Sequence, residues 1–236
     1  MGTLLVTGAT GGIAQAVIRS GLNDWKVVAL SRQSKPEDFH GERWIRMETC
    51  DPSRLNEVMN ELEPDALIHT VGSTLIGPMT GVDATQFEAL IRTNLVSAFL
   101  MLQAFVANLK SRRVQGSAVL FSSVVAQIGV ANHEAISAAK AGIDGLVRSS
   151  AASYASAGIR INAVAPGLTE TPLTQSLLSH EATRAAAIKQ YPLAGINQSR
   201  DLAQTALWLV SEAASRITGQ VVVVDGGFSS IRPLVR

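Results

Sequence analysis

Short apolar runs alternate along the chain with longer segments that show helical patterns. The runs are rich in Val, Ile and Leu and lack polar alternation, which is typical of strands buried on both faces of a parallel sheet. Strand–helix alternation of this kind predicts a doubly wound α/β sheet. The predicted strands are residues 4–7, 27–30, 45–48, 66–69, 118–121, 159–163 and 221–224, and the predicted helices are residues 12–21, 52–61, 83–108, 133–156 and 199–212.

One stretch interrupts this alternation. Some thirty residues between Pro166 and Ser199 contain two prolines and only short helical patterns. The stretch follows the carboxyl end of a predicted strand, where ligands bind in open α/β sheets. We therefore expect a lid over a substrate at about residues 168–198, within one domain that spans residues 1–236.

Composition narrows the classes of function. The chain has 236 residues, 47% of them hydrophobic, and a formal net charge of +1, which gives no electrostatic case for nucleic acid or an anionic membrane. No apolar run reaches the roughly 18 residues of a membrane span. Cys50 is the only cysteine, no signal peptide is visible, and we predict no metal site. We expect a cytoplasmic protein that binds a small molecule.

A glycine-rich turn follows the first predicted strand and opens the first predicted helix, in the sequence Thr-Gly-Ala-Thr-Gly-Gly-Ile-Ala from Thr7 to Ala14. Glycines let the backbone approach a pyrophosphate, and the helix offers free N–H groups to the anion. An ordinary strand–helix turn is the alternative. The predicted pyrophosphate-binding residues are Gly8, Thr10, Gly11, Gly12 and Ile13.

The second predicted strand is followed by Ser31 and Arg32 rather than by an acidic residue. An acidic side chain here would hydrogen-bond the ribose hydroxyls of NAD, whereas a hydroxyl and a cation suit the 2′-phosphate of NADP. NADP(H) is therefore favoured over NAD(H), against the alternative of a surface arginine.

A further pattern joins the fifth strand to the helix that follows it. Ser123 and Lys140 lie seventeen residues apart, and Ile136 stands thirteen residues after the serine. The stretch resembles the active-site segment of the short-chain dehydrogenase/reductase family, which has Ser, Tyr and Lys at these spacings. The glycine-rich turn resembles the family's TGxxxGxG motif, with Ala14 in place of the last glycine. The resemblance extends from residue 3 to about 228 and implies a Rossmann-type, mostly seven-stranded parallel sheet with helices on both faces.

The resemblance also implies roles for individual residues. Lys140 would bind the nicotinamide ribose, Ser123 would orient the substrate oxygen, and Asn94 would hold a water in a proton relay. Asp51 matches an aspartate that binds the adenine amine, although a plain Asp-Pro turn is an alternative. His69 stands where the family has asparagine, and we expect a buried structural role for it. The remaining residues implied to bind the cofactor are Gly72, Pro166, Gly167, Thr169 and Thr171.

By the same resemblance we expect a homodimer or homotetramer, formed through the two long helices and the last strand.

The family's acid is missing, because Ile136 has no proton to give. Loss of such an acid typically costs about 10²–10⁴ in rate. Tyr154 is fourteen residues beyond Lys140 on the same predicted helix, roughly 20 Å away, and Tyr191 in the lid is expected to pack that segment. His133 shares a helical face with Ile136 and Lys140, and imidazole titrates near pH 6.5. His133 is therefore the candidate acid, although the Lys140 cation and the helix N-terminus would disfavour its charged form.

Two functions remain open from the sequence. The first is an NADP(H)-dependent oxidoreductase that acts on a carbonyl, an alcohol or a conjugated double bond. The second is a catalytically impaired NADP(H)-binding homologue that works as a sensor or partner subunit, with Ile136 as an apolar wall of its pocket.

Overall fold

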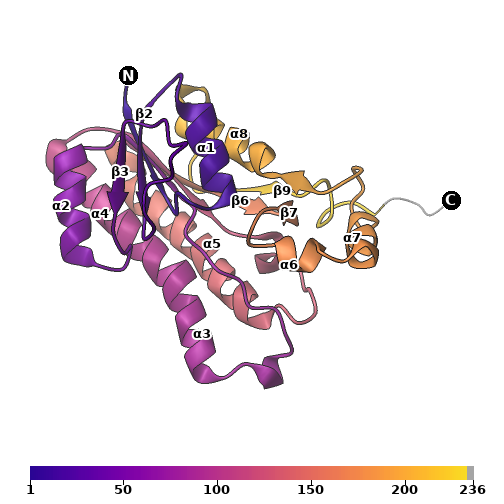
Figure 1. Cartoon of the computed structure of the whole chain (residues 1–236). Coiled ribbons are helices and arrows are strands. Elements are labelled where there is room, and N and C mark those ends of the chain that lie inside the picture. The colour runs from indigo at the N-terminus through magenta and orange to yellow at the C-terminus, as the bar shows by residue number, and fades with distance from the viewer. Residues whose placement is uncertain (233–236) are drawn as a thin grey trace.

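A seven-stranded parallel sheet forms the centre of the molecule (Figure 1). The structure is a computed structural model that describes residues 1–232. The strand order is β3-β2-β1-β4-β5-β6-β9, so the order of connection reverses between β1 and β4. In doubly wound sheets ligands bind at the carboxyl ends of the strands on either side of such a reversal. The strands are β1 (Thr3–Thr7), β2 (Lys26–Ser31), β3 (Arg43–Arg46), β4 (Ala66–His69), β5 (Gly116–Phe121), β6 (Ile159–Pro166) and β9 (Val221–Val224).

Helices cover both faces of the sheet, because side chains along each strand point alternately to the two sides. Leu5 packs in one core with α2, α4 and α5, whereas Leu4 and Val6 pack in a second core with α1 and α8. Aliphatic side chains make up most of both cores, as the uninterrupted hydrophobic strands predict. The α-helices are α1 (Gly12–Gly21), α2 (Pro52–Leu62), α3 (Ala84–Ile91), α4 (Ser97–Arg112), α5 (Glu134–Tyr154), α6 (Gln175–Leu178), α7 (Glu181–Ile188) and α8 (Ser199–Val210).

The long helix predicted over residues 83–108 is interrupted in the structure. A π-helical turn, η2 (Arg92–Val96), separates α3 from α4 and carries Asn94. The Nδ2 of Asn94 donates to the Leu90 carbonyl at 3.0 Å. A π-helical turn inside a helix often marks a functional site. Short 3₁₀ segments occur at η1 (Met79–Gly81), η3 (Val124–Ala126), η4 (Ala155–Ala157) and η5 (Glu212–Ala214).

One helical stretch is long and apolar enough, by length and composition, to cross a membrane, although polar residues interrupt its apolar runs. The continuous helical stretch Ala84–Arg112 has 29 residues and a mean hydropathy of 1.6 over its most apolar window. Half of that window is buried inside the protein, where α4 packs against α2 and the sheet. A core helix passes the same test, because burial in a fold and burial in a lipid bilayer select the same side chains.

The predicted lid stretch forms its own small unit beside the main sheet (Figure 1). Two short strands, β7 (Thr169–Glu170) and β8 (Asn197–Gln198), pair in parallel. Helices α6 and α7 lie between them in the chain. The Arg184 side chain on α7 donates to both carboxylate oxygens of Glu170, at 2.8 and 3.2 Å, which fastens α7 to β7.

Candidate active site

The glycine-rich turn has the backbone that its composition predicts. Gly8 has a φ of +72°, and a Cβ on it would lie 2.8 Å from Thr70 Oγ1 and 3.0 Å from the Val71 nitrogen. No side chain with a Cβ fits there without displacing backbone. Gly11 precedes α1, and no side chain caps that helix. The first N–H groups of α1 are therefore free to bind an anion.

The turn also contacts the lid segment. A Cβ on Gly12 would lie 3.1 Å from Pro172 Cδ and 3.1 Å from Ser199 Oγ. Ile13 lines the adjoining cavity. Ala14, at the position of the family's last glycine, is buried in the core between α1 and the sheet. The alanine is accommodated by packing and does not reach the surface where a pyrophosphate would lie.

The ends of β2 and β3 place two cations side by side. Arg32 is exposed, and its guanidinium lies 3.8 Å from Glu48. The Nε of Arg46 donates to the Arg32 carbonyl at 3.1 Å. Sequence reasoning missed Arg46, although the register that pairs Ser31 with Arg46 follows once β2 and β3 are neighbours. Ser31 is buried, and its Oγ accepts the Gln33 N–H.

Asp51 begins α2. Its carboxylate accepts the Arg54 N–H at 3.2 Å, with Pro52 in the first helical turn. In this structure Asp51 therefore caps the helix as part of an Asp-Pro turn, which was the alternative to binding the adenine amine. The side chain is exposed, which leaves its second oxygen accessible.

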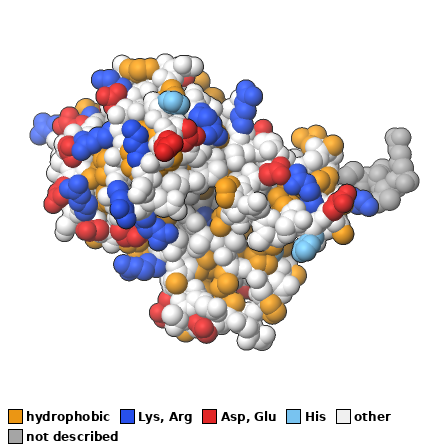
Figure 2. All heavy atoms as spheres, in the orientation of Figure 1, with side chains coloured by type: hydrophobic (Ala, Val, Ile, Leu, Met, Phe, Trp, Pro, Cys, Tyr) orange, Lys and Arg blue, Asp and Glu red, His pale blue; other side chains and the backbone are white. Residues whose placement is uncertain are grey.

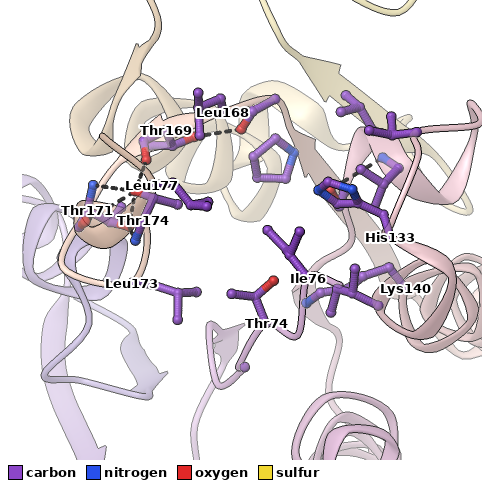
Figure 3. A pocket seen from close by; sticks show the side chains of 18 of the residues that line it. Thr74, Ile76, His133, Lys140, Leu168, Thr169, Thr171, Leu173, Thr174 and Leu177 are labelled. Carbon is purple, nitrogen blue, oxygen red and sulfur yellow. Dashed lines mark hydrogen bonds between the residues drawn. The ribbon is translucent and has the colours of Figure 1, made fainter. Parts of the chain in front are cut away.

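A cavity of about 430 Å³ lies between α5 and the lid at the carboxyl end of the sheet. Figure 3 shows His133 and Lys140 on the α5 side of it, with Leu168, Thr169 and Leu177 opposite. Figure 2 shows hydrophobic side chains gathered on the part of the molecule that carries the lid, whereas Lys and Arg lie mainly over the region of α2 and β3. Ten predicted site residues line this cavity, namely Ile13, Gly72, Asn94, Ser123, His133, Lys140, Pro166, Gly167, Thr169 and Thr171.

Lys140 is the buried cation of the site. Its Nζ donates to the Phe121 carbonyl at 2.9 Å. A Cβ on Gly72 would lie 3.5 Å from this Nζ and 2.9 Å from Asn94 Oδ1, so the glycine leaves room for both groups to approach the same space. Burial lowers the pKa of Lys140 to about 8, and the negative charge of Asp144 acts against that shift.

Ser123 lies near the start of the loop that joins β5 to α5. Its Oγ accepts the Val125 N–H at 3.4 Å. The loop is tied to α5 by two further hydrogen bonds, since Ser137 Oγ donates to the Val125 carbonyl at 2.7 Å and Ser122 Oγ to the Lys140 carbonyl at 3.3 Å. These contacts fix Ser123 relative to Lys140.

His133 immediately precedes α5 and lines the cavity. Its Nδ1 lies 2.8 Å from the Ala131 carbonyl oxygen. A carbonyl can only accept, so Nδ1 carries a proton and Nε2 is the nitrogen left for other partners. Ile136, one turn further, is 5% exposed and also lines the cavity.

The other candidates for a proton donor lie differently. Tyr191 reaches the cavity, but its hydroxyl oxygen accepts the Leu168 N–H at 2.6 Å and its ring stacks on Phe228. Tyr154 is absent from the cavity lining and lies under Lys110, whose Nζ is 5.7 Å from the ring centroid.

His69 is buried, as expected. Its ring nitrogens lie 2.7 Å from Thr7 Oγ1 and 3.2 Å from Ser97 Oγ. Burial, with a smaller contribution from the Lys140 charge, lowers the pKa of His69 to about 3. The ring is therefore neutral at physiological pH and links β1, β4 and α4.

The cavity wall is mostly apolar, and sequence reasoning missed much of it. Among the described residues that line it, the ionisable side chains are Lys140, His133 and Tyr191, and no carboxylate is present. The described residues contain no cluster of metal-ligating side chains. The apolar side chains not predicted from the sequence include Ile76, Val125, Val130 and Phe228.

Comparisons with known proteins identify the class of this protein. The family model described as enoyl-(acyl carrier protein) reductase matches residues 10–229. A tropinone reductase homolog from Arabidopsis thaliana is 32% identical over 95% of this chain and 92% of its own. A 3-oxoacyl-[acyl-carrier-protein] reductase from Thermotoga maritima is 30% identical over 94% of this chain and 96% of its own.

Solved structures agree. An oxidoreductase of the short-chain dehydrogenase/reductase family from Burkholderia thailandensis superposes with a TM-score of 0.89 at 30% identity, over 96% of this chain and 92% of its own. ElxO with NADP bound superposes with a TM-score of 0.90 at 26% identity, over 98% of this chain and all of its own. The chain belongs to the short-chain dehydrogenase/reductase family, and its seven-stranded Rossmann-type fold is the fold of that family.

Proposed function

We propose that this protein is an NADP(H)-dependent oxidoreductase that acts on a small, largely apolar molecule bearing a carbonyl, an alcohol or a conjugated double bond. The observation that carries the proposal is one cavity, at the carboxyl end of the sheet, that is lined by Asn94, Ser123 and Lys140 together. Its apolar wall without carboxylates suits a substrate that carries no positive charge.

The residues present fit a nicotinamide dinucleotide. Gly8 and Gly72 each leave space that a Cβ would fill, and the uncapped start of α1 offers N–H groups for the pyrophosphate. Lys140 and the segment from Pro166 to Thr171 would hold the nicotinamide end. When bound, the cofactor supplies or accepts the hydride.

The preference for NADP(H) rests on Arg32 with Ser31, supported by Arg46 beside them. Two guanidinium groups at the ends of β2 and β3 favour a 2′-phosphate through charge-assisted hydrogen bonds. That ElxO has been solved with NADP bound supports the same assignment.

Ser123 and Lys140 would stabilise negative charge on a substrate oxygen. Preorganised donors of this kind act most strongly where charge develops during the reaction. Ile136, at the predicted position of the family's tyrosine, supplies no proton. Since Nδ1 of His133 donates to the Ala131 carbonyl, Nε2 can give up a proton only from the imidazolium form, and we assign that form the role of proton donor.

A conjugated double bond needs this donor least. In its reduction the hydride goes to the carbon β to the carbonyl group, and negative charge develops on the carbonyl oxygen. Ser123 and Lys140 would stabilise that charge. The proton then goes to the carbon next to the carbonyl group. Reduction of an isolated ketone requires a proton at the oxygen itself, where Ile136 stands.

The test is NADPH oxidation against a panel of ketones, quinones and enoyl thioesters, with His133→Ala and His133→Gln beside the wild type. We expect turnover by the wild type. For ketones we expect both variants to lose about 10²–10⁴-fold, since glutamine retains hydrogen bonding but cannot transfer a proton, and for enoyl thioesters we expect a smaller loss. Equal rates in His133→Gln and wild type would remove His133 from the mechanism.

A buried Ile136 in the acid's predicted position also favours a second candidate, an impaired homologue that binds NADP(H) as a sensor or partner subunit. Tight NADPH binding without turnover of any panel member by the wild type would select it. On either function we infer a cytoplasmic homo-oligomer.

A further inference from the structure

Asp144 is a buried carboxylate that the proposed function does not use. It lies one helical turn after Lys140 on α5 and is 6% exposed. Its Oδ1 is buried and has no hydrogen-bond partner among the residues that the structure describes. Burial raises the pKa of this carboxyl group. A buried carboxylate oxygen without a partner is costly and calls for an explanation in terms of the charges around it.

Lys140 is the buried cation nearest to Asp144 along the helix. Residues four apart on a helix share a face, and their Cβ atoms are about 5–6 Å apart. Lys140 is 9% exposed, so water screens the two charges weakly. The other charged neighbour of Asp144 is Arg148, a turn further along α5 and exposed.

Asp144 sits behind Lys140 as seen from the substrate. Lys140 lines the cavity, whereas Asp144 does not. The side chains of Ser122 and Gln127, on the loop that carries Ser123, lower the pKa of Asp144 and so act against the effect of burial. Asp144 therefore touches neither substrate nor cofactor, and any effect it has on the reaction must pass through Lys140 or this loop.

The remaining ionisable groups at this end of the site cannot replace it. His69 faces Lys140 from β4 and is neutral above about pH 4, because burial lowers its pKa to about 3. His133 and Tyr191, which line the cavity from the start of α5 and from the lid, supply no negative charge near neutral pH. In the described part of the chain, Asp144 is thus the carboxylate whose negative charge acts on Lys140.

We propose that Asp144 is a positioning residue whose negative charge keeps the buried Lys140 ammonium protonated for binding the cofactor ribose. The inference rests on the proposed function only in taking Lys140 as a cofactor-binding residue. Without the carboxylate, burial acts on Lys140 unopposed, and the lysine becomes neutral at a lower pH. The neutral amine is a weaker donor, so cofactor affinity falls first at alkaline pH.

The test is NADPH affinity from pH 6 to 9.5, measured by cofactor fluorescence for wild type and Asp144→Asn. A lysine with a pKa of about 8 is half protonated at pH 8. If the pKa of Lys140 falls to about 7 in Asp144→Asn, about a tenth of the lysine is protonated at pH 8. We therefore expect about five-fold weaker NADPH binding by this variant at pH 8 and unchanged binding at pH 6. The fall in NADPH affinity at alkaline pH, here called the basic limb, should begin at a lower pH in Asp144→Asn. Asp144→Glu should return it to the wild-type pH.

Two further variants identify the limb. Lys140→Met should abolish it, which assigns it to the lysine. Arg148→Gln removes the other charge beside Asp144, on the exposed side, and should leave the limb in place. Unfolding midpoints for every variant separate a change in affinity from a failure to fold.

The possible outcomes separate this inference from the proposed function. If wild type binds NADPH with a basic limb that Asp144→Asn leaves unmoved, the role of Asp144 is overturned and the proposed function stands. Weakened binding of Asp144→Asn at pH 6 as much as at pH 8 would indicate a structural role only and would also overturn the inference. If wild type binds neither NADPH nor NADH at any pH, the proposed function fails and the inference fails with it.

Discussion

Ile136 stands at the position that the sequence predicts for the proton donor. It is buried, it lines the cavity, and it lies on the same helix as Lys140 and His133. An isoleucine at this position presents methyl groups, which cannot donate a proton. The apolar surface can position a substrate, but the proton must come from elsewhere.

Restoring the phenol should therefore change the substrates that are turned over. We expect Ile136→Tyr to raise the rate of ketone reduction by about 10²–10⁴-fold. Ile136→Phe is the matched control, since it adds nearly the same ring without the hydroxyl and should give no gain. The measurement is NADPH oxidation with a ketone panel, after circular dichroism confirms that both variants fold. Equal rates for the two variants would show that position 136 is not the acid's position.

Sequence reasoning identified the residues whose chemistry is local and missed those that depend on packing. Gly8 could be predicted, because a turn with a positive φ selects glycine wherever it occurs. Arg46 could not, because it joins Arg32 only through the register of β2 and β3. Asp144 is visible as a residue four after Lys140, but its burial and its unpartnered oxygen are properties of the folded chain.

At the level of elements, the sequence predicted which segments are strands and helices, and erred on continuity and boundaries. The helix predicted over residues 83–108 is broken by the π-helical turn at Arg92–Val96, because nothing in an apolar, Leu-rich run marks where a helix widens. The strand predicted at residues 45–48 is β3, Arg43–Arg46, two residues earlier. Its polar ends, Arg43 and Arg46, hide it from a search for apolar runs.

The lid is held by an interaction that a single substitution can remove. Glu170 on β7 accepts from Arg184 on α7 and from Gln198 on β8. Hydrogen bonds from Arg184 and then Gln198 lower the pKa of Glu170 to about 2. A carboxylate with a lowered pKa stabilises the folded form above its unfolded pKa near 4.5 and loses that effect as the pH falls toward 2. The contact is therefore intact throughout the neutral range.

Glu170→Gln should loosen α7 without unfolding the main sheet. Because the pair is exposed to solvent, we expect only about a two- to five-fold faster hydrogen–deuterium exchange in peptides covering residues 175–190. Glu57→Gln breaks the Arg54–Glu57 ion pair on α2, far along the chain, and should leave lid exchange unchanged. Unaltered exchange in Glu170→Gln would mean that packing rather than this ion pair holds the lid closed.

On the scale of the whole molecule, the fold leaves some large apolar side chains uncovered. Several large apolar side chains are exposed away from the cavity, on two separate faces. Phe87 and Phe99 lie on α3 and α4, whereas Trp208 and Val223 lie on α8 and the edge strand β9. Exposed aromatic side chains on the helices and an apolar residue on the edge strand are candidate contacts with a partner.

Two such faces predict assembly through one or both of them. We expect light scattering to give a homodimer or homotetramer at micromolar concentration. Phe99→Asp and Val223→Lys place a charge on each face in turn, because burying an unpaired charge in an interface is strongly unfavourable. In a tetramer each variant should leave dimers, whereas in a dimer only one variant should give monomers. Val114→Lys, a similar change in the turn after α4, should alter nothing. A monomeric wild type would contradict the prediction and leave both apolar faces for partners of another kind.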